Sequence, residues 1–155
     1  MVGLGNGEFV SLDSALRPKS LIRILIAEDF GAFRRLICSI LQKRQDFYVV
    51  CEVSDGLEAV RKAEELKPDL ILLDIGLPNL NGLQAAREIL QLAPQSRIIF
   101  VSQESSADLV QEALCLGAQG YVAKTRLESD LLTAVEAVLE GRRFVSSNLI
   151  ADGPG

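Results

Sequence analysis

From residue 21 onwards, short apolar runs alternate with longer stretches of helical period, and no other feature of the chain restricts its fold so strongly. The runs span residues 21–27, 47–53, 69–74, 97–102 and 120–123. Those at 21–27, 69–74 and 97–102 are almost continuously apolar, as strands that are buried on both faces must be. Strict alternation of strand and helix predicts a doubly wound α/β fold, with a parallel sheet covered by helices on both faces.

The stretches between the runs have the pattern of amphipathic helices. One stretch places apolar residues at positions i, i+3, i+4, i+7 and i+8 of a helical stripe: Phe33, Leu36, Ile37, Ile40 and Leu41. Similar stripes run through residues 83–90 and 131–139. Pro68 and Pro94 each stand just before a strand, where a helix must already have ended.

Length and local composition divide the chain into three parts. Its 155 residues are enough for one domain with a substantial core. Residues 1–20 contain scattered glycines and show no sustained period, so we expect a flexible N-terminal leader. Residues 21–144 then form the folded domain, and residues 145–155 form a C-terminal tail that resembles the start of a linker.

Composition and charge exclude several classes of protein. Hydrophobic residues make up 48% of the chain and charged residues 24%, which is typical of a soluble globular protein. No apolar run approaches the ~20 residues that span a bilayer, and no signal peptide is evident, so we expect a cytoplasmic protein without membrane contact. The formal net charge of −5 argues against a nonspecific nucleic-acid surface.

The chain contains no histidine, which removes histidine bases, Ser-His triads and most zinc sites. The three cysteines, Cys38, Cys51 and Cys115, are odd in number and widely spaced, which suits a reducing compartment. We expect them to be small buried hydrophobes. Any chemistry must therefore use carboxylates, lysine, hydroxyls or a metal ion.

Polar side chains follow the predicted strands at their carboxyl ends. Glu28 and Asp29 follow the first strand, Asp74 ends the third, Ser102 ends the fourth and Lys124 follows the fifth. In an open parallel sheet these ends lie at one edge, where ligands bind. Each residue alone has an ordinary interpretation as a helix cap, a turn residue or a solvated lysine. Their convergence on one edge favours a functional site.

The predicted cluster has the composition of a phosphoryl-transfer site. Three carboxylates that lie together repel one another unless a cation lies among them. Oxygen ligands without histidine or cysteine suit a hard ion, so we expect Mg²⁺ or Mn²⁺. Lys124 and Ser102 add a positive charge and a hydroxyl donor. Phosphoryl transfer needs this neutralisation of phosphoryl oxygens more than it needs covalent help.

These motifs resemble the receiver domain of bacterial two-component response regulators over about residues 22–142. The resemblance rests on the acidic pair, DIGLPNLNG around Asp74, the serine after the fourth strand, and GYVAK with its lysine. It implies the flavodoxin-like or CheY-like (βα)5 fold, a three-layer sandwich whose five parallel strands have the order 2-1-3-4-5. It also implies that the chain catalyses only its own phosphorylation and dephosphorylation.

The resemblance assigns a role to each residue of the cluster. Asp74 is implied to be the phosphoacceptor. Asp29 is implied to bind the metal directly and Glu28 through water, while the backbone carbonyl of Gly76 supplies another ligand. Lys124 is implied to pair with Asp74 and then with a phosphoryl oxygen.

The same resemblance implies a switch. Ser102 moves to the phosphoryl group, and Tyr121 turns inward into the space that it leaves. Gln103 and Glu104, together with Gly76, are hypothetical tuners of the phosphoryl lifetime. The phosphoryl donor is implied to be a sensor histidine kinase.

The chain is most similar to receivers of the NarL/LuxR-type transcriptional regulators, which often carry a stretch like residues 117–146. Members of that group usually continue into a helix-turn-helix DNA-binding output domain. We expect a receiver from a longer regulator, with a stand-alone receiver as the alternative. Homodimerisation is also implied, without a choice of face, and direct nucleic-acid binding by this domain is not expected.

One departure from the family pattern concerns the loop after Lys124. Thr125 stands where many receivers have proline, and their Lys-Pro bond is often cis. A cis Lys124–Thr125 bond would cost ~3 kcal/mol, so the loop is expected to differ from theirs.

Two other functions compete with the switch. A degenerate receiver would be a constitutive interaction module, although the acidic residues, the serine and the lysine are all retained. A phosphohydrolase with an aspartyl nucleophile usually has a second aspartate two residues after the first, where this chain has Gly76.

Overall fold

A computed structural model describes residues 21–104 and 106–146 of the chain. The predicted leader and most of the predicted tail lie outside the described residues. The strands are β1 (Ile22–Ala27), β2 (Phe47–Val53), β3 (Leu70–Asp74), β4 (Arg97–Ser102), β5 (Gly120–Ala123) and β6 (Phe144–Val145). The helices are α2 (Gly31–Leu41), α3 (Gly56–Leu66), α4 (Gly82–Leu92), α5 (Ala107–Leu116) and α6 (Leu127–Leu139), and η1 (Lys124–Arg126) is a single 3-10 turn.

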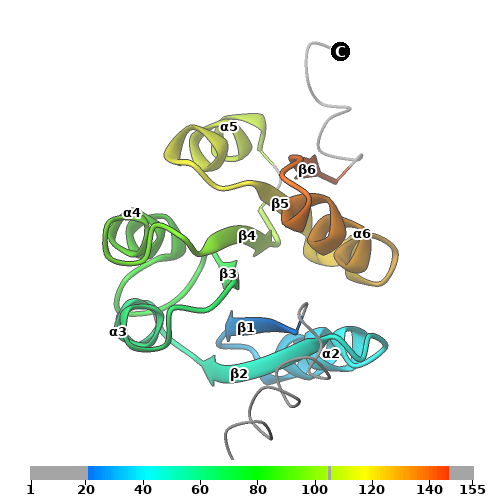
Figure 1. The fold of residues 1–155 in the computed structure, drawn as a ribbon. Coiled ribbons are helices and arrows are strands. Elements are labelled where there is room, and N and C mark those ends of the chain that lie inside the picture. Colours follow the sequence, from blue (N-terminus) through cyan, green and yellow to red (C-terminus); the bar gives the residue numbers. More distant parts are fainter. Residues whose placement is uncertain (1–20, 105, 147–155) are drawn as a thin grey trace, which may run out of the picture.

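All strands pair in parallel in one sheet of order β2-β1-β3-β4-β5-β6. The predicted fold class and the predicted order of the first five strands are confirmed. The sixth strand was not predicted, because its two residues are too short to show a period in the sequence. β6 also crosses the boundary expected at residue 144. Helices α3, α4 and α5 cover one face of the sheet, and α2 and α6 cover the other (Figure 1).

The two faces of β3 show why its sequence is a continuous apolar run. All five of its residues are buried. Ile71 and Leu73 belong to the core beneath α3, α4 and α5, whereas Leu70 and Leu72 belong to the core beneath α2 and α6. Each such side chain contributes about 1.5–3 kcal/mol of hydrophobic free energy relative to an exposed one. A strand covered on both sides therefore has no polar position to alternate with.

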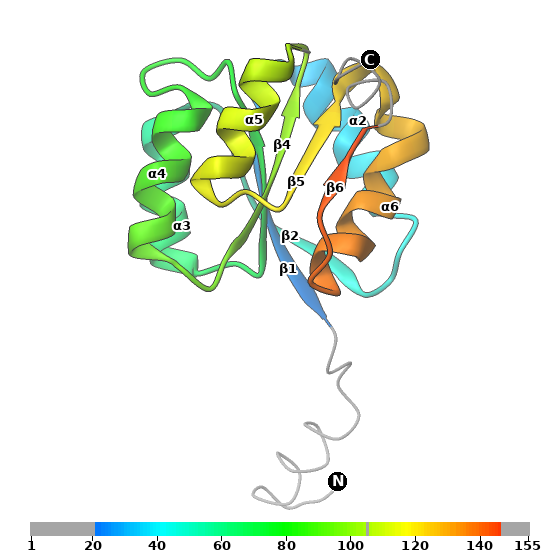
Figure 2. The same ribbon diagram turned by 90° about the horizontal axis from the view of Figure 1, so that it is seen from above.

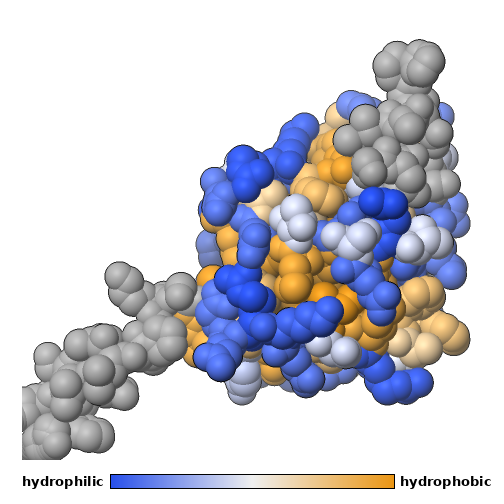
Figure 3. Space-filling model, turned by 90° about the vertical axis from the view of Figure 1, so that its right-hand side faces the viewer, coloured by the Kyte–Doolittle hydropathy of each residue, from blue (hydrophilic) through white to orange (hydrophobic). Residues whose placement is uncertain are grey.

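The face that carries α2 and α6 is not fully covered by polar side chains. Figure 3 shows apolar surface between charged groups on this side of the molecule. Several apolar residues of this layer are only partly buried: Phe33, Leu36, Leu132, Leu139 and Phe144. None of the helices in the described ranges 21–104 and 106–146 is long and apolar enough to cross a membrane.

The strands run side by side in one direction, so their carboxyl ends meet at one end of the sheet (Figure 2). Two glycines fix the loop that follows β3 there. A Cβ on Gly82 would lie 2.3 Å from the carbonyl oxygen of Asp74, and one on Gly56 would lie 1.7 Å from that of Leu80. Because only glycine fits at these contacts, the starts of α3 and α4 pack directly on the backbone between β3 and α4.

The cysteines are less buried than the sequence analysis predicts. Cys38 and Cys51 are partly buried and Cys115 is exposed, and all three are free thiols. Burial, together with the charge of Glu52, raises the pKa of the Cys38 thiol to about 11. A thiol of this kind stays largely protonated at neutral pH, which makes Cys38 a poor nucleophile.

Candidate functional site at the carboxyl edge of the sheet

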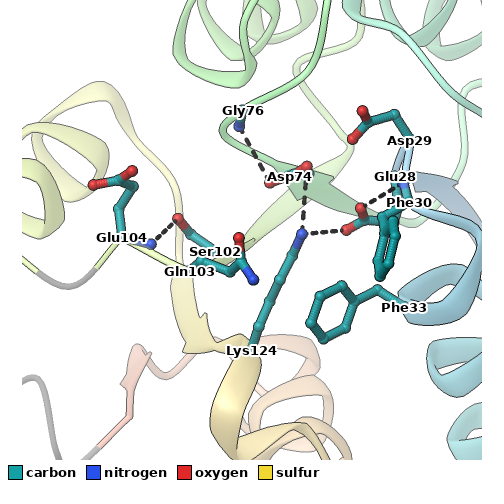
Figure 4. Close-up of a pocket in the computed structure, with 10 residues that line it drawn as sticks. All are labelled: Glu28, Asp29, Phe30, Phe33, Asp74, Gly76, Ser102, Gln103, Glu104 and Lys124. Carbon is teal, nitrogen blue, oxygen red and sulfur yellow. Dashed lines mark hydrogen bonds and ion pairs between the residues drawn. The ribbon is translucent and has the colours of Figure 1, made fainter.

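A pocket lies where the carboxyl ends of β1, β3 and β4 meet the turn after β5 (Figure 4). Ten residues line it: Glu28, Asp29, Phe30, Phe33, Asp74, Gly76, Ser102, Gln103, Glu104 and Lys124. The structure thus brings together every residue that the sequence predicts for the site except Tyr121. Tyr121 lies on β5, fully buried.

Three carboxylates form the acidic part of the pocket. Oxygen atoms of Glu28, Asp29 and Asp74 all lie within 4.8 Å of one another, close enough to hold one metal ion. Glu28 and Asp74 are buried, whereas Asp29 is exposed. The backbone N–H of Phe30 donates to Glu28 Oε2 at 3.0 Å, and that of Gly76 donates to Asp74 Oδ1 at 3.1 Å. These bonds orient the two buried carboxylates.

The buried ammonium of Lys124 lies between two of these carboxylates. Its Nζ is 2.8 Å from Glu28 Oε1 and 3.4 Å from Asp74 Oδ2 (Figure 4). The closer partner is therefore Glu28, which the sequence analysis did not anticipate. The peptide bond between Lys124 and Thr125 is trans, since the described residues contain no cis peptide bond. The 3-10 turn η1 begins at Lys124 and carries the chain into α6.

The charges of the pocket do not balance. Burial raises the pKa of Glu28, and its repulsion from Asp74 raises it further, against the opposing effects of Lys124 and the Phe30 N–H. Burial likewise raises the pKa of Asp74, and Lys124 and the Gly76 N–H only partly offset it. The formal charges of the three clustered carboxylates and the Lys124 ammonium leave two negative charges, which one divalent cation neutralises, and Glu104 at the rim adds a fourth carboxylate to the lining.

A test of fit for a metal ion is whether the ligand atoms have other partners. Glu28 Oε1 is fully buried and accepts no well-directed hydrogen bond from the described residues, although the Lys124 ammonium is near. Donors that are all carboxylate oxygens suit a hard cation such as Mg²⁺. The residues present therefore fit a divalent cation.

Ser102 and Tyr121 both bond to the backbone of Glu104. The Glu104 N–H donates to Ser102 Oγ at 2.9 Å, and the Tyr121 hydroxyl donates to the Glu104 carbonyl at 3.1 Å. Tyr121 is already turned inward, with its ring centroid 6.3 Å from that of Phe100. Burial raises the pKa of Tyr121, so its hydroxyl stays protonated as a donor. The start of the loop after β4 is thus held by a residue at the end of β4 and a residue of β5.

The remaining predicted residues form the exposed rim. Gln103 and Glu104 are exposed where β4 ends. Gly76 is exposed on the β3 side, where an added Cβ would meet only Asp74 Oδ1, at 4.0 Å. A side chain at position 76 would therefore have room to lie over Asp74.

Sequence reasoning missed two aromatic residues in the lining. Phe30 is 58% exposed, and its ring centroid is 5.5 Å from that of Phe33. Phe33 was assigned to the core stripe of its helix, but the Lys124 ammonium lies over its ring, 4.5 Å from the centroid. In the sequence Phe33 has the spacing of an ordinary residue of the apolar helical stripe, so no signal there indicated this contact.

Comparison with known proteins identifies the family of this chain. Residues 24–136 match the response regulator receiver domain family. The chain belongs to that family, whose members are the receiver modules of two-component systems, and among its relatives and structural neighbours are LuxR-type and CheY-like proteins.

Three similar proteins illustrate the match. The transcriptional regulatory protein DegU of Brevibacillus brevis is 34% identical over 135 residues, which are 84% of this chain and 57% of DegU. The chemotaxis protein CheY of Listeria monocytogenes is 35% identical over 75% of this chain and 97% of its own length. The crystal structure of a LuxR-family response regulator from Aurantimonas sp. SI85-9A1 superposes with a TM-score of 0.81, at 32% identity, over 85% of this chain and 94% of that one. The chain spans little more than half of the length of DegU.

Proposed function

We propose that this chain is a phosphorylation-dependent switch in which Asp74 accepts a phosphoryl group from the phosphohistidine of a sensor histidine kinase. The observation that carries the proposal is the placement of Asp74: its buried carboxylate lies in a pocket, 3.4 Å from a lysine ammonium and beside two further carboxylates. The receiver domain family, to which this chain belongs, is a family of phosphoacceptor switches, and this supports the proposal. Residues 1–155 contain no histidine, so the phosphohistidine of the donor lies outside this sequence.

Residues of the pocket divide the work of the transfer. An oxygen of the Asp74 carboxylate attacks phosphorus, the P–N bond to the donor imidazole breaks, and the imidazole nitrogen keeps the bonding pair. Asp29, Asp74 and the carbonyl of Gly76 would hold Mg²⁺ or Mn²⁺, with Glu28 acting through water. A bound divalent cation neutralises charge on the phosphoryl oxygens.

Lys124 is paired with Glu28 as well as with Asp74, and it would have to separate from Glu28 to follow a phosphoryl group. Its ammonium is closer to Glu28 than to Asp74, and a phosphoryl group on Asp74 would bring three more oxygens to its other side. We expect Lys124 to move toward a phosphoryl oxygen. The carboxylate of Glu28 then has only the cation to balance it, so metal binding and phosphorylation support each other.

The structural change caused by phosphorylation passes from the pocket to the surface through the backbone of Glu104. Ser102 would lose the hydrogen bond that it accepts from the Glu104 N–H, and its hydroxyl would donate a hydrogen bond to the phosphoryl group. The bond from Tyr121 to the Glu104 carbonyl would hold the rearranged loop and keep the ring inward. The surface near α5 and β5 changes as a result. Gln103 and Glu104, with Gly76, would set how long the phosphoryl group survives, because they control access to Asp74.

The larger protein and its partners follow from the relatives. We propose that residues 21–144 are the receiver and that the following residues lead to an output domain, a proposal supported by the transcriptional regulatory protein DegU, of which this chain covers only 57%. That output domain would bind DNA and regulate transcription, whereas the receiver, with an acidic pocket and a net charge of −5, would not bind nucleic acid itself. A second copy of the receiver, which would form a homodimer with the first, is a further expected partner.

One experiment tests the proposal. The protein is incubated with Mg²⁺ and acetyl phosphate, and its intact mass is measured over time. We expect the gain of one phosphoryl group, lost in Asp74→Asn and kept in Asp69→Asn, which changes an exposed aspartate before the other end of β3. If neither a phosphoryl group nor Mg²⁺ binds, the interaction module is the better explanation. Rapid turnover of unrelated phosphate esters would instead indicate a hydrolase.

A further inference from the structure

Phe33 contacts the ammonium of Lys124 from an element that supplies none of the predicted site residues. Phe33 lies in the first turns of α2, half-buried, and Lys124 follows β5 on the other side of the pocket. The ammonium is 4.5 Å from the centroid of the Phe33 ring, over its face. Figure 4 shows the ring beside the lysine side chain, near Glu28 and Phe30.

The ring takes a place that water or another acceptor would otherwise fill. A lysine ammonium has three N–H groups, and here two carboxylates, of Glu28 and Asp74, lie within ion-pair distance. The face of an aromatic ring is its negative side and attracts a cation. Because Lys124 is only 7% exposed, water competes weakly for this position and the attraction is stronger than on a surface.

We propose that Phe33 is a positioning residue for Lys124, holding its ammonium between Glu28 and Asp74 by a cation–π contact. The inference rests on the proposed function, since Lys124 has to reach a phosphoryl group on Asp74. A ring face attracts the ammonium over a broad area, so the contact persists while the ammonium moves from one carboxylate toward the other. A third carboxylate at this position would instead bind the ammonium tightly and add to the negative charge.

The sharpest test changes the electronics of the ring and leaves its shape almost unchanged. Phenylalanine analogues with one, two and three ring fluorines are incorporated at position 33, which weakens the negative face in steps. We expect the rate of phosphorylation by acetyl phosphate at saturating Mg²⁺ to fall in steps, to about one fifth with three fluorines. Phe33→Leu, which keeps an apolar side chain and removes the ring, should be slowed by a similar factor.

A matched control exists elsewhere in the fold. The guanidinium of Arg44 lies 4.7 Å from the centroid of the Phe47 ring, away from the pocket. The same fluorinated series at position 47 weakens a comparable contact and should leave the phosphorylation rate unchanged. A general effect of fluorine on folding would appear at both positions.

A second measurement does not depend on phosphorylation. The urea midpoint is compared across the fluorinated series at position 33, in the wild-type background and in Lys124→Met. We expect the midpoint to fall with fluorination only where the lysine is present, because fluorination then weakens the cation–π contact between the ring and the ammonium.

The outcomes separate the inference from the proposed function. Suppose that the wild-type protein takes no phosphoryl group, but that fluorination of Phe33 lowers the urea midpoint only when Lys124 is present. This result would overturn the switch and support the contact between Phe33 and Lys124. The role of Phe33 would be overturned if the wild type is phosphorylated normally and neither the phosphorylation rate nor the urea midpoint changes along the fluorinated series. Slowing in Phe33→Leu with a flat fluorinated series would also overturn it, because packing alone would then explain the effect.

Discussion

Replacing Ser146 with alanine removes a buried hydroxyl that joins β5, α6 and the end of β6. Ser146 is fully buried, and its Oγ accepts from the backbone N–H of Ala123 at 3.0 Å. The same hydroxyl donates to Asp130 Oδ2 at 2.8 Å. Ala123 directly precedes Lys124, so the network fixes the backbone from which the lysine of the pocket projects.

The cost of Ser146→Ala is the sum of two losses. A buried N–H left without an acceptor, here that of Ala123, costs about 1–3 kcal/mol. A hydrogen bond to a charged group contributes about 1.5–3 kcal/mol, but Asp130 keeps its contact with Arg126 Nε at 3.0 Å, which reduces this loss. We expect the free energy of unfolding to fall by about 3 kcal/mol, a large part of the 5–15 kcal/mol typical of a domain.

Urea unfolding at neutral pH measures this difference. The midpoint should fall while the slope with urea concentration stays unchanged, because the surface exposed on unfolding is the same. Ser129→Ala is the matched control: its hydroxyl donates to Asp130 Oδ1 at 3.0 Å, but the residue is exposed. This control should lose less than about 1 kcal/mol. A loss within about 0.5 kcal/mol for Ser146→Ala would refute the reasoning, because the buried groups would then have found other partners.

Three further predictions concern Asp130, the loop after β3 and the acidic cluster. Burial opposes ionisation of Asp130, but hydrogen bonds from Arg126 and nearby serines lower the pKa of its carboxyl group below 3.8. The ionised carboxylate therefore stabilises the fold fully above pH 3.8, and this contribution is lost as the pH falls through the pKa of the folded state. The difference in stability between wild type and Asp130→Asn, measured by urea unfolding, should therefore be constant above about pH 5 and shrink below about pH 4; a difference that grows in acid would contradict this. Gly82→Ala should lose about 2–3 kcal/mol because its Cβ would lie 2.3 Å from the Asp74 carbonyl, whereas Gly76→Ala should change the stability by less than about 1 kcal/mol; equal losses would disprove the close contact. Mg²⁺ at 100 times its Kd should raise the free energy of unfolding by about 2.7 kcal/mol, and Asp29→Asn should lose most of this gain; an unchanged gain would remove Asp29 from the metal site.

The fold was largely predictable because the pattern that specifies it is local. Residues 97–102 and 120–123 were predicted as strands with the bounds that the structure has for β4 and β5. A strand between two helical layers needs apolar residues on both faces, so burial is visible in the sequence itself. The two residues of β6 offer no period, and their pairing with β5 depends on where α6 ends.

The sequence by itself determined which charged side chains of the strand ends meet in the pocket. Strand alternation places Asp74, the acidic pair Glu28 and Asp29, and Lys124 at one edge of the sheet, because parallel strands share a direction. Position along a strand is therefore enough to predict proximity. The same reasoning could not predict which atoms touch within the pocket.

Only the tertiary structure decided the partners of Lys124. Its ammonium lies closer to Glu28 than to Asp74, and over the ring of Phe33, a residue that the sequence assigned to the core. These contacts join three parts of the chain that are far apart in sequence: the β1–α2 segment, the end of β3 and the turn after β5. They depend on the depth and angle at which helices pack on the sheet, and no local pattern of residues encodes that packing.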